Sequence, residues 1–287
     1  MAEDIKGVLY LCATPIGNLE DITLRALRVL READLIAAED TRHTRKLLSH
    51  YDIHTPLTSY HQHNRKKKGE TLLELLGSGK NIALVSDAGL PGVSDPGSEL
   101  VAEALEKGYR VVPIPGPSAG ITALVVSGLP TETFVFIGFL PAAKKSRQEK
   151  LHELSCQRGT LIFYESPHRL RATLADFVEI LGNRPAAAAR ELTKKYEEII
   201  RGTLEKVQEH FKEIEPRGEF TLVVAGATGE DVPQRKEEAW SHLGPAAHVA
   251  MLEAEGAGRK DAIRETARLR GLPRKEVYRA VVEENKT

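Results

Sequence analysis

The stretch Ser86-Asp-Ala-Gly-Leu-Pro-Gly-Val-Ser-Asp-Pro-Gly97 decides the fold of this 287-residue chain. The apolar run Ile82–Val85 precedes it and predicts a buried strand, and the apolar face of residues 98–107 predicts a helix that ends at Gly108. Residues 110–113 then predict the next strand. A strand, a loop rich in Gly and Pro, a helix and another strand are the repeating unit of an α/β fold with a largely parallel sheet.

Four more loops of this kind directly follow predicted strands. They are Thr14-Pro-Ile-Gly-Asn-Leu-Glu-Asp-Ile-Thr23, Glu39-Asp-Thr-Arg42, Pro115-Gly-Pro-Ser-Ala119 and Glu165-Ser-Pro-His-Arg169. In open α/β sheets, ligands bind outside the carboxyl ends of the strands. Glycine lets backbone approach a ligand closely, and proline stiffens a loop. One such loop is an ordinary connection, but five with interleaved carboxylates predict a shared crevice.

The pattern predicts two αβ domains and a helical appendage. The αβ domains cover residues 1–116 and 117–228, with a cleft between them, and residues 226–238 have the Gly, Pro and charge content of a linker. Three helical patterns follow at residues 246–255, 261–270 and 273–283. They predict a small all-α module over residues 240–287 that resembles a helix-turn-helix unit.

Composition and missing motifs exclude several classes. The formal net charge is −1, so any nucleic-acid site must be a local basic patch. The two cysteines, Cys12 and Cys156, form no CxxC pattern, which argues against disulfides and zinc and favours the cytoplasm. No apolar run reaches the roughly 20 residues of a membrane span, and residues 1–6 do not resemble a signal peptide. The motifs GxGxxG, GxxxxGK[ST] and HExxH are absent, which excludes Rossmann-type, P-loop and zincin sites.

Five blocks of sequence carry a specific resemblance. They are Ala38-Glu-Asp-Thr-Arg42, residues 86–97, Pro115-Gly-Pro-Ser-Ala119, Glu165-Ser-Pro-His-Arg169 and Arg190-Glu-Leu-Thr-Lys-Lys195. Together they resemble the small-subunit rRNA (cytidine-2′-O)-methyltransferase family, a branch of the tetrapyrrole methylase superfamily. The similarity extends from about residue 8 to residue 225, and the helical tail also resembles that family. It implies S-adenosylmethionine-dependent 2′-O-methylation of a cytidine ribose in the decoding region of 16S rRNA, by a homodimer.

The superfamily binds S-adenosylmethionine in the cleft between its two αβ domains. Carried over to this chain, the resemblance implies a cofactor site and a wall at Tyr164. The implied cofactor-binding residues are Asp87, Ala88, Gly89, Leu90, Pro117, Ser118, Ala119 and Tyr164. The alternative is that Asp87 only stabilises a turn or caps a helix, and that Ser118 is an ordinary N-cap.

A ribose 2′-hydroxyl is a weak acid, so a base, or a cation beside the developing alkoxide, would assist methyl transfer. The catalytic candidates are Asp40, Glu165, Arg190 and Lys194, within a wider group that includes Glu39, Arg42 and His168. The competing interpretation is a salt-bridge network between loops, because perturbed carboxylates serve both purposes.

Two basic segments are candidates for contact with 16S rRNA or the small ribosomal subunit. One is the expected loop His61-Gln-His-Asn-Arg-Lys-Lys-Lys68, whose histidines lack a third partner and predict no metal site. The other is the tail, with Lys260, Arg264, Arg268, Arg270, Arg274, Lys275 and Arg279. In both, a solvated polar surface is the alternative. Rival functions are a corrin-precursor methyltransferase and a non-catalytic nucleic-acid-binding protein.

Overall fold

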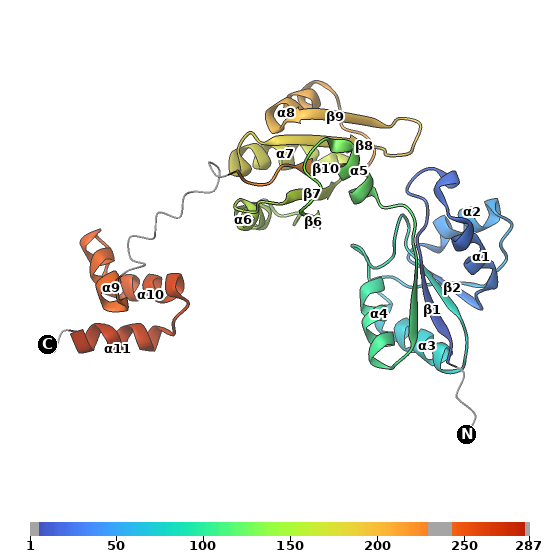
Figure 1. The fold of residues 1–287 in the computed structure, drawn as a ribbon, viewed down its shortest axis with the longest axis horizontal. Helices are drawn as coiled ribbons and strands as arrows, with labels where there is room; N and C mark the ends of the chain where they lie inside the picture. Colours follow the sequence, from blue (N-terminus) through green and yellow to red (C-terminus); the bar gives the residue numbers. More distant parts are fainter. Residues whose placement is uncertain (1–5, 229–242, 285–287) are drawn as a thin grey trace. The chain divides into compact units, whose positions relative to one another are not determined.

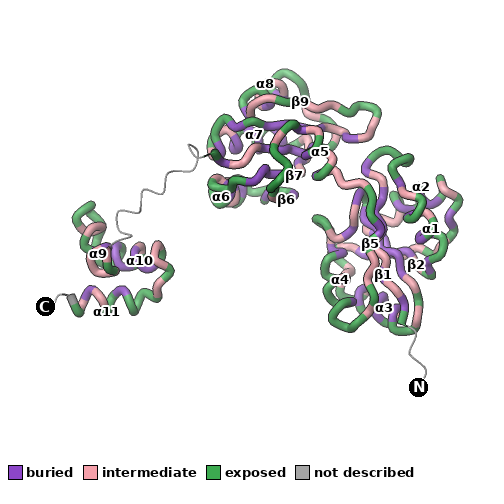
Figure 2. Tube along the Cα trace, in the orientation of Figure 1, coloured by how far each residue is buried: buried purple, intermediate pink, exposed green. Residues whose placement is uncertain are grey.

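The computed structural model describes residues 6–228 and 243–284. It divides into two compact units, Met1–Ala227 and Thr228–Thr287 (Figure 1). Buried residues follow the strands and the inner faces of the helices, and exposed residues lie on the outer faces (Figure 2).

The first sheet of the larger unit is entirely parallel, with the strand order β3-β2-β4-β1-β5. This confirms the parallel sheet predicted from the alternating pattern. All its strands end at one edge, so the loops that follow them start together. The strands are β1 (Val8–Cys12), β2 (Leu35–Ala38), β3 (Leu57–Ser59), β4 (Ile82–Val85) and β5 (Arg110–Ile114).

Helices cover both faces of this sheet, which is why its central strands are mainly apolar. Helices α1 (Leu24–Glu32) and α2 (Thr41–His50) pack against one face. Helices α3 (Arg65–Gly77) and α4 (Gly97–Glu106) pack against the other. Thr23 caps α1, because its side chain accepts a hydrogen bond from the Ala26 N–H. A short 3₁₀ turn, Leu19–Asp21, lies in the first loop.

The second sheet is mixed, with the strand order β6-β7-β10-β8-β9. Only β6 and β7 pair in parallel; the other neighbours are antiparallel. The alternation of helices and strands in the second half therefore continues, but it does not repeat the parallel topology of the first half. The strands are β6 (Phe134–Phe139), β7 (Thr160–Glu165), β8 (Pro185–Arg190), β9 (Glu198–Thr203) and β10 (Phe220–Val224).

The two faces of this sheet have different tasks. Helices α6 (Lys144–Leu154), α7 (Pro167–Leu181) and α8 (Leu204–Glu213) cover one face around the fully buried Phe163, Phe177 and Phe211. Burying each such ring contributes about 1.5–3 kcal/mol. Of the described helices, α5 (Ala119–Ser127) alone covers the other face, and Ile16 from the first loop joins that core. The first loop is thus anchored on the second sheet.

The smaller unit contains the three helices α9 (Pro245–Ala254), α10 (Arg259–Arg270) and α11 (Arg274–Glu284). Their core includes Val249, Ile263, Val277 and Val281. Gly271 ends α10 in the left-handed region with φ 63°, which glycine adopts without strain. The three predicted helices are confirmed, although the predicted start of the module at residue 240 lies outside the described residues.

Two elements were not predicted, and one was assigned wrongly. Strand β3 and helix α8 are additional. Residues 65–68 were treated as part of a basic loop, but they form the first turn of α3. No helix among the described residues is long and apolar enough to cross a membrane.

Candidate active site

All five strand-end loops contribute to one pocket of about 540 Å³ in the larger unit. This confirms that the loops share a crevice. The lining residues are Ile16, Glu39, Ser86, Asp87, Ala88, Gly89, Leu90, Val93, Ser94, Asp95, Ser118, Ala119, Phe139, Tyr164, Glu165, Ser166, Pro167, Ala189, Leu192, Glu219, Phe220 and Thr221. They come from both sheets, so the pocket combines the edge of the first with the α5-covered face of the second.

Close backbone approach sets the shape of one wall. Thr14 and Gly89 exchange hydrogen bonds, from Thr14 N to Gly89 O at 2.8 Å and from Gly89 N to Thr14 O at 3.1 Å. Gly89 has φ 79°, and a Cβ there would lie 3.3 Å from the Pro117 carbonyl oxygen. A side chain would be strained at this position and would crowd the loop that contains Pro117. Pro117 itself lies outside the lining set but touches this wall.

Asp87 and Asp40 connect two of the loops. The Asp87 carboxylate accepts a hydrogen bond from the Asp40 backbone N–H at 2.8 Å. The Asp40 carboxylate caps α2 through the Arg42 N–H, and it binds the Arg42 guanidinium with a shortest distance of 2.7 Å. These hydrogen bonds hold the pKa of Asp40 well below its usual range. Asp40 therefore fixes the loop and does not line the pocket.

Glu39, the residue before Asp40, does line the pocket. Burial raises the pKa of Glu39, and the negative charges of Asp87 and Asp95 raise it further. The Asp95 carboxylate accepts hydrogen bonds from the N–H groups of Gly92 at 2.9 Å and Gly97 at 2.7 Å, which folds the third loop back on itself. The carboxylates of Asp87 and Asp95 thus lie close enough to that of Glu39 to repel it electrostatically.

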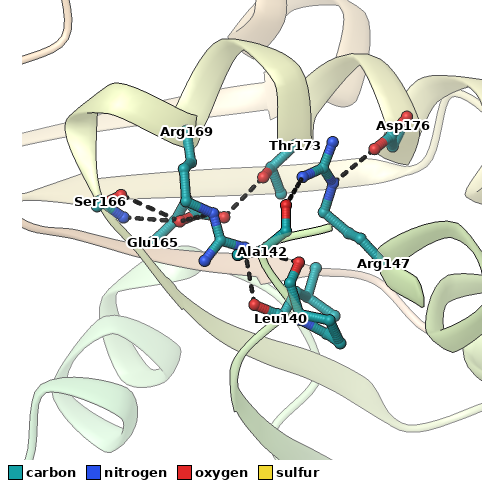
Figure 3. A network of polar contacts seen from close by, with 9 residues as sticks. Leu140, Ala142, Arg147, Glu165, Ser166, Arg169, Thr173 and Asp176 are labelled. Carbon is teal, nitrogen blue, oxygen red and sulfur yellow. Dashed lines mark hydrogen bonds and ion pairs between the residues drawn. The ribbon is translucent and has the colours of Figure 1, made fainter. Parts of the chain in front are cut away.

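Glu165 lies at the end of β7, with a side chain that is only 1 % exposed (Figure 3). It accepts hydrogen bonds from the Thr173 hydroxyl at 2.6 Å and the Ser166 N–H at 2.8 Å. Arg169 Nε lies 3.4 Å from the same carboxylate, and its Nη2 donates to the carbonyls of Leu140 and Pro141. The carboxylate is therefore occupied by groups of the loop and helix that follow it.

A second buried ion pair lies beside this network in Figure 3. Arg147 Nε donates to Asp176 at 2.6 Å, and both side chains are less than 10 % exposed, at 7 % and 4 %. Arg147 Nη1 also donates to the Ala142 carbonyl at 3.3 Å. The segment after β6 is thus held by two arginines, each of which is bound to a buried carboxylate.

Tyr164 and Ser118 face the pocket from the second sheet and from α5. The Tyr164 hydroxyl accepts a hydrogen bond from the Gly120 N–H at 3.2 Å, and burial raises the pKa of this tyrosine. Its ring packs edge-on against Phe136 and Phe139. Ser118 is the N-cap of α5, but its side chain makes no capping hydrogen bond. The Ser118 hydroxyl thus does not serve the helix as an ordinary N-cap would.

Lys194 and Arg190 lie behind the pocket lining. Lys194 Nζ donates to Glu191 and Glu219, both at 2.9 Å, and Glu219 is a lining residue. Burial alone would lower the pKa of Lys194, but these two hydrogen bonds outweigh it and raise the pKa. Arg190 donates to the Arg217 carbonyl at 2.7 Å and pairs with Glu198 at 3.3 Å.

The structure brings most of the predicted cofactor residues together. Asp87, Ala88, Gly89, Leu90, Ser118, Ala119 and Tyr164 all line the pocket. Among the four catalytic candidates Glu165 lines it, whereas Asp40, Arg190 and Lys194 do not. Asp95 belongs to a quoted loop, and its place between two glycines could have indicated it. Phe139 ends a strand, but Glu219 precedes one and carried no such signal.

No group of three or more His, Cys, Asp or Glu residues in the described ranges is arranged to hold a metal ion. The acidic side chains of the pocket therefore do not converge as a metal-ligand set.

A protein-family model described as "Tetrapyrrole (Corrin/Porphyrin) Methylases" matches residues 8–208. The chain belongs to the tetrapyrrole methylase family. This tetrapyrrole methylase is 55% identical to ribosomal RNA small subunit methyltransferase I of Halalkalibacterium halodurans, over 96% of this chain and 94% of that protein. It is 51% identical to the protein of that name in Bacillus subtilis, over 96% and 94%, and 46% identical to that in Escherichia coli O157:H7, over 99% and 97%. The family indicated by the sequence motifs is confirmed.

Solved structures show the same fold at lower identity. Diphthine synthase superposes with a TM-score of 0.59 at 16% identity, covering 77% of this chain and 91% of that one. Uroporphyrin-III C-methyltransferase from Thermus thermophilus, complexed with S-adenosylhomocysteine, gives a TM-score of 0.53 at 21% identity, covering 76% and 97%. The predicted tetrapyrrole methylase fold is thus confirmed.

Proposed function

We propose that this protein transfers a methyl group from S-adenosylmethionine to the 2′-oxygen of a cytidine ribose in the decoding region of 16S rRNA. The observation that carries the proposal is the single pocket built from all five strand-end loops, in a chain about half identical to rRNA small subunit methyltransferases I. The chain is an S-adenosylmethionine-dependent methyltransferase. The cytidine and the 2′-oxygen rest on the resemblance of the motifs.

The residues of the pocket fit this cofactor. Its volume of about 540 Å³ and its mixture of backbone, aromatic and acidic groups suit a nucleoside joined to an amino acid. The N-terminus of α5 at Ser118 would bind the methionine carboxylate, because helix N-termini attract anions. Tyr164 and Phe139 would pack against the adenosine, and residues 87–90 would contact it through their backbone. The bound cofactor supplies an electrophilic methyl group.

The catalytic contribution of this chain is mainly positioning. Holding the acceptor oxygen in line with the methyl group removes much of the entropic barrier. Of the four catalytic candidates, Glu165 would keep β7 and α7 in register and Asp40 would hold its own loop. Lys194 would fix Glu219 at the pocket wall, and Arg190 would hold the segment before β10. In this proposal all four are positioning residues.

The start of α3 is the first proposed RNA contact in the larger unit. Arg65 pairs with Glu99, and the Tyr60 hydroxyl donates to the Pro96 carbonyl, so the segment is tied to the third pocket loop. Lys66 and Lys67 are exposed, and no acidic residue lies in the first turn. Exposed cations beside the pocket suit the phosphates that flank a target nucleotide.

The helical unit is the second proposed RNA contact. Arg264 and Arg268 pair with acids three residues earlier, and Arg270 donates to His248 and Leu243, so these three have structural partners. Arg274, Lys275 and Arg279 are exposed on α11, next to the exposed Tyr278. A basic helix face with an aromatic ring suits RNA.

The proposal also covers the location, the domains and the oligomeric state of the protein. The enzyme works in the cytoplasm, and residues 1–116, 117–228 and 240–287 are its domains. It forms a homodimer through α5, which contains no charged residue and leaves Ile121 45% and Val125 63% exposed. Val125→Glu should shift sedimentation from dimer to monomer; wild-type protein that sediments as a monomer would remove the dimer from the proposal.

The deciding experiment is deletion of the gene followed by mapping of 2′-O-methyl groups on 16S rRNA. One decoding-region methyl group should disappear and return when the gene is restored. An unchanged map would overturn the proposed acceptor. Calorimetry addresses the non-catalytic alternative, which requires that purified protein not bind S-adenosylmethionine.

A corrin-precursor substrate is less compatible with the pocket. Among the described residues, the lining contains five acidic side chains and no Lys, Arg or His. A macrocycle that carries several carboxylates would meet repulsion there, because like charges in a partly desolvated site are costly. A ribose hydroxyl is neutral and meets no such repulsion.

A further inference from the structure

The pocket carries an unbalanced negative charge. Its acidic lining residues are Glu39, Asp87, Asp95, Glu165 and Glu219. Two of them have a cationic neighbour, since Glu165 lies 3.4 Å from Arg169 and Glu219 lies 2.9 Å from Lys194. The remaining three carboxylates form no ion pair within residues 6–228 and 243–284.

Asp87 and Asp95 have structural tasks that account for their presence. Asp87 holds the Asp40 N–H, and Asp95 holds two glycine N–H groups of its own loop. Glu39 differs, because among the described residues its carboxylate accepts a hydrogen bond only from the Asp87 backbone. The guanidinium of Arg42 is bound to Asp40, and its side chain is 85% exposed. Its charge also acts on Asp87, whereas no cation of the described residues acts on Glu39.

Placing Glu39 beside Asp87 and Asp95 costs free energy in the empty protein, since like charges repel and burial removes water. Nothing in the described fold needs the charge on Glu39. A metal ion does not account for it, because no metal-ligand arrangement occurs among the described residues. A cationic ligand would offset the cost.

We infer that Glu39, with Asp87 and Asp95, makes the pocket selective for the charge of its ligand, so that it binds the sulfonium form of the cofactor more tightly than the neutral thioether left after methyl transfer. This inference rests on the proposed function. Transfer forms a bond between the methyl carbon and the acceptor oxygen, whose proton passes to water, and it breaks the bond between sulfur and the methyl carbon, so that the sulfur keeps the electron pair. The ligand thereby loses one positive charge, and the attraction of the carboxylates for it weakens.

Selectivity of this kind acts on binding rather than on the chemical step. The positive charge on sulfur already falls in the transition state, so the carboxylates stabilise the bound cofactor more than the transition state. Removing the charge of Glu39 should therefore raise KM for the cofactor, strengthen product inhibition and raise kcat modestly where the chemical step limits it. Glu39 is thus a specificity-determining residue.

Calorimetry on the purified full-length protein tests this without an activity assay. The ligands are S-adenosylmethionine, S-adenosylhomocysteine and an analogue with an ammonium group in place of the methylated sulfonium. Glu39→Gln should weaken binding of the two cationic ligands about tenfold, or about 1.4 kcal/mol. Binding of S-adenosylhomocysteine should change less than about twofold.

Glu106→Gln is the matched control. Glu106 is exposed at the end of α4, and the ten residues of that helix separate it by about 15 Å from the pocket loop that precedes Gly97. It removes the same charge from the same unit without touching the pocket, so all three affinities should stay as in the wild type.

The outcomes separate the inference from the proposed function. Wild-type protein that binds no S-adenosylmethionine would overturn the proposed function. Wild-type binding with an equal loss for all three ligands in Glu39→Gln, or with no loss, would overturn the inference alone. If circular dichroism shows that the variant is unfolded, the wild type still decides. In the wild type, rising ionic strength must weaken the binding of S-adenosylmethionine more than the binding of S-adenosylhomocysteine. Equal salt dependences of the two affinities would overturn the inference.

Discussion

Replacing Glu165 with glutamine separates a structural role from a catalytic one. The carboxylate is 1 % exposed and holds the Thr173 hydroxyl at 2.6 Å, the Ser166 N–H at 2.8 Å and Arg169 at 3.4 Å. A hydrogen bond to a charged group contributes about 1.5–3 kcal/mol, and glutamine retains one acceptor oxygen but not the charge. We therefore expect Glu165→Gln to lower the free energy of unfolding by about 2–4 kcal/mol.

Urea denaturation followed by circular dichroism measures this loss, and a methyl-transfer assay on the folded protein measures the rate. Thr173→Val removes one partner and should cost about 1–3 kcal/mol. Asp176→Asn is the matched control, because it breaks a buried ion pair outside the pocket lining and should cost about 3–5 kcal/mol with the rate retained. Wild-type stability in Glu165→Gln, with a rate about 10²–10⁴-fold lower, would refute the structural role and identify Glu165 as the base.

Three further predictions follow from single contacts. Burial and the neighbouring aspartates raise the pKa of Glu39, so the folded state is more stable when Glu39 is protonated, and this stability is lost as pH rises through the raised pKa. Glu39→Gln removes the charge and should therefore raise the Tm of the apo-protein at about pH 7 but not at about pH 4. Equal changes of Tm at the two pH values would contradict this prediction. In Gly17→Ala the new methyl would lie 2.4 Å from Cγ of Lys194; denaturation should show a loss of about 1–3 kcal/mol, whereas unchanged stability would mean that the loop moves freely. In filter binding, Arg279→Ala should lower the slope of log affinity against log salt concentration for RNA by about one counterion. Arg264→Ala removes a cation that is already paired with Asp261 and should change that slope less. Equal slopes for the two variants would remove α11 from the RNA contact.

The first half of the chain could be predicted in detail because its signals are local. Ile82–Val85 is an apolar run between turn residues, and Thr23 is a cap before a helical pattern. Strand β3 has only three residues, all half-buried at an edge, so it carries no periodicity. Helix α8 was missed despite a signal, since Thr203 caps it and its buried side chains are spaced as on one helix face. The start of α3 was hidden because Asn64 supplies no capping hydrogen bond and four basic residues follow it.

The topology of the second sheet could not be derived from the order of its elements. Strand β10 inserts between β7 and β8, which depends on long-range pairing. The short connection from Arg190 to Glu198 does favour an antiparallel pair, because parallel neighbours need a long crossover. That signal was present, but the alternation of helices and strands concealed it.

Loop positions could be predicted better than side-chain roles. Parallel strands bring their ends to one edge, so the strings themselves located the cofactor residues. The role of a charged residue depends on its neighbours in space, which the strings do not contain. Asp40 is held by its own loop and Lys194 by Glu219, a residue twenty-five positions away. The alternative of a salt-bridge network therefore describes Asp40, Glu165, Arg190 and Lys194 well.

The distribution of charge across the protein limits what can be methylated. The net charge is −1, yet Lys66 and Lys67 are exposed on α3 and Arg274, Lys275 and Arg279 on α11, while the described pocket lining has acids and no bases. In the proposed complex these surface cations would therefore attract RNA phosphates, and the acidic lining would repel them. The group that enters must be a part of the RNA without charge, and it must approach a cofactor that the same acids attract. A ribose hydroxyl meets both conditions, since it is neutral until its proton leaves. Replacing Lys66 and Lys67 with glutamate should thus weaken RNA binding and leave the affinity for the cofactor unchanged. The positive charge of α3 lies outside the pocket lining, and the acidic lining acts on the cofactor.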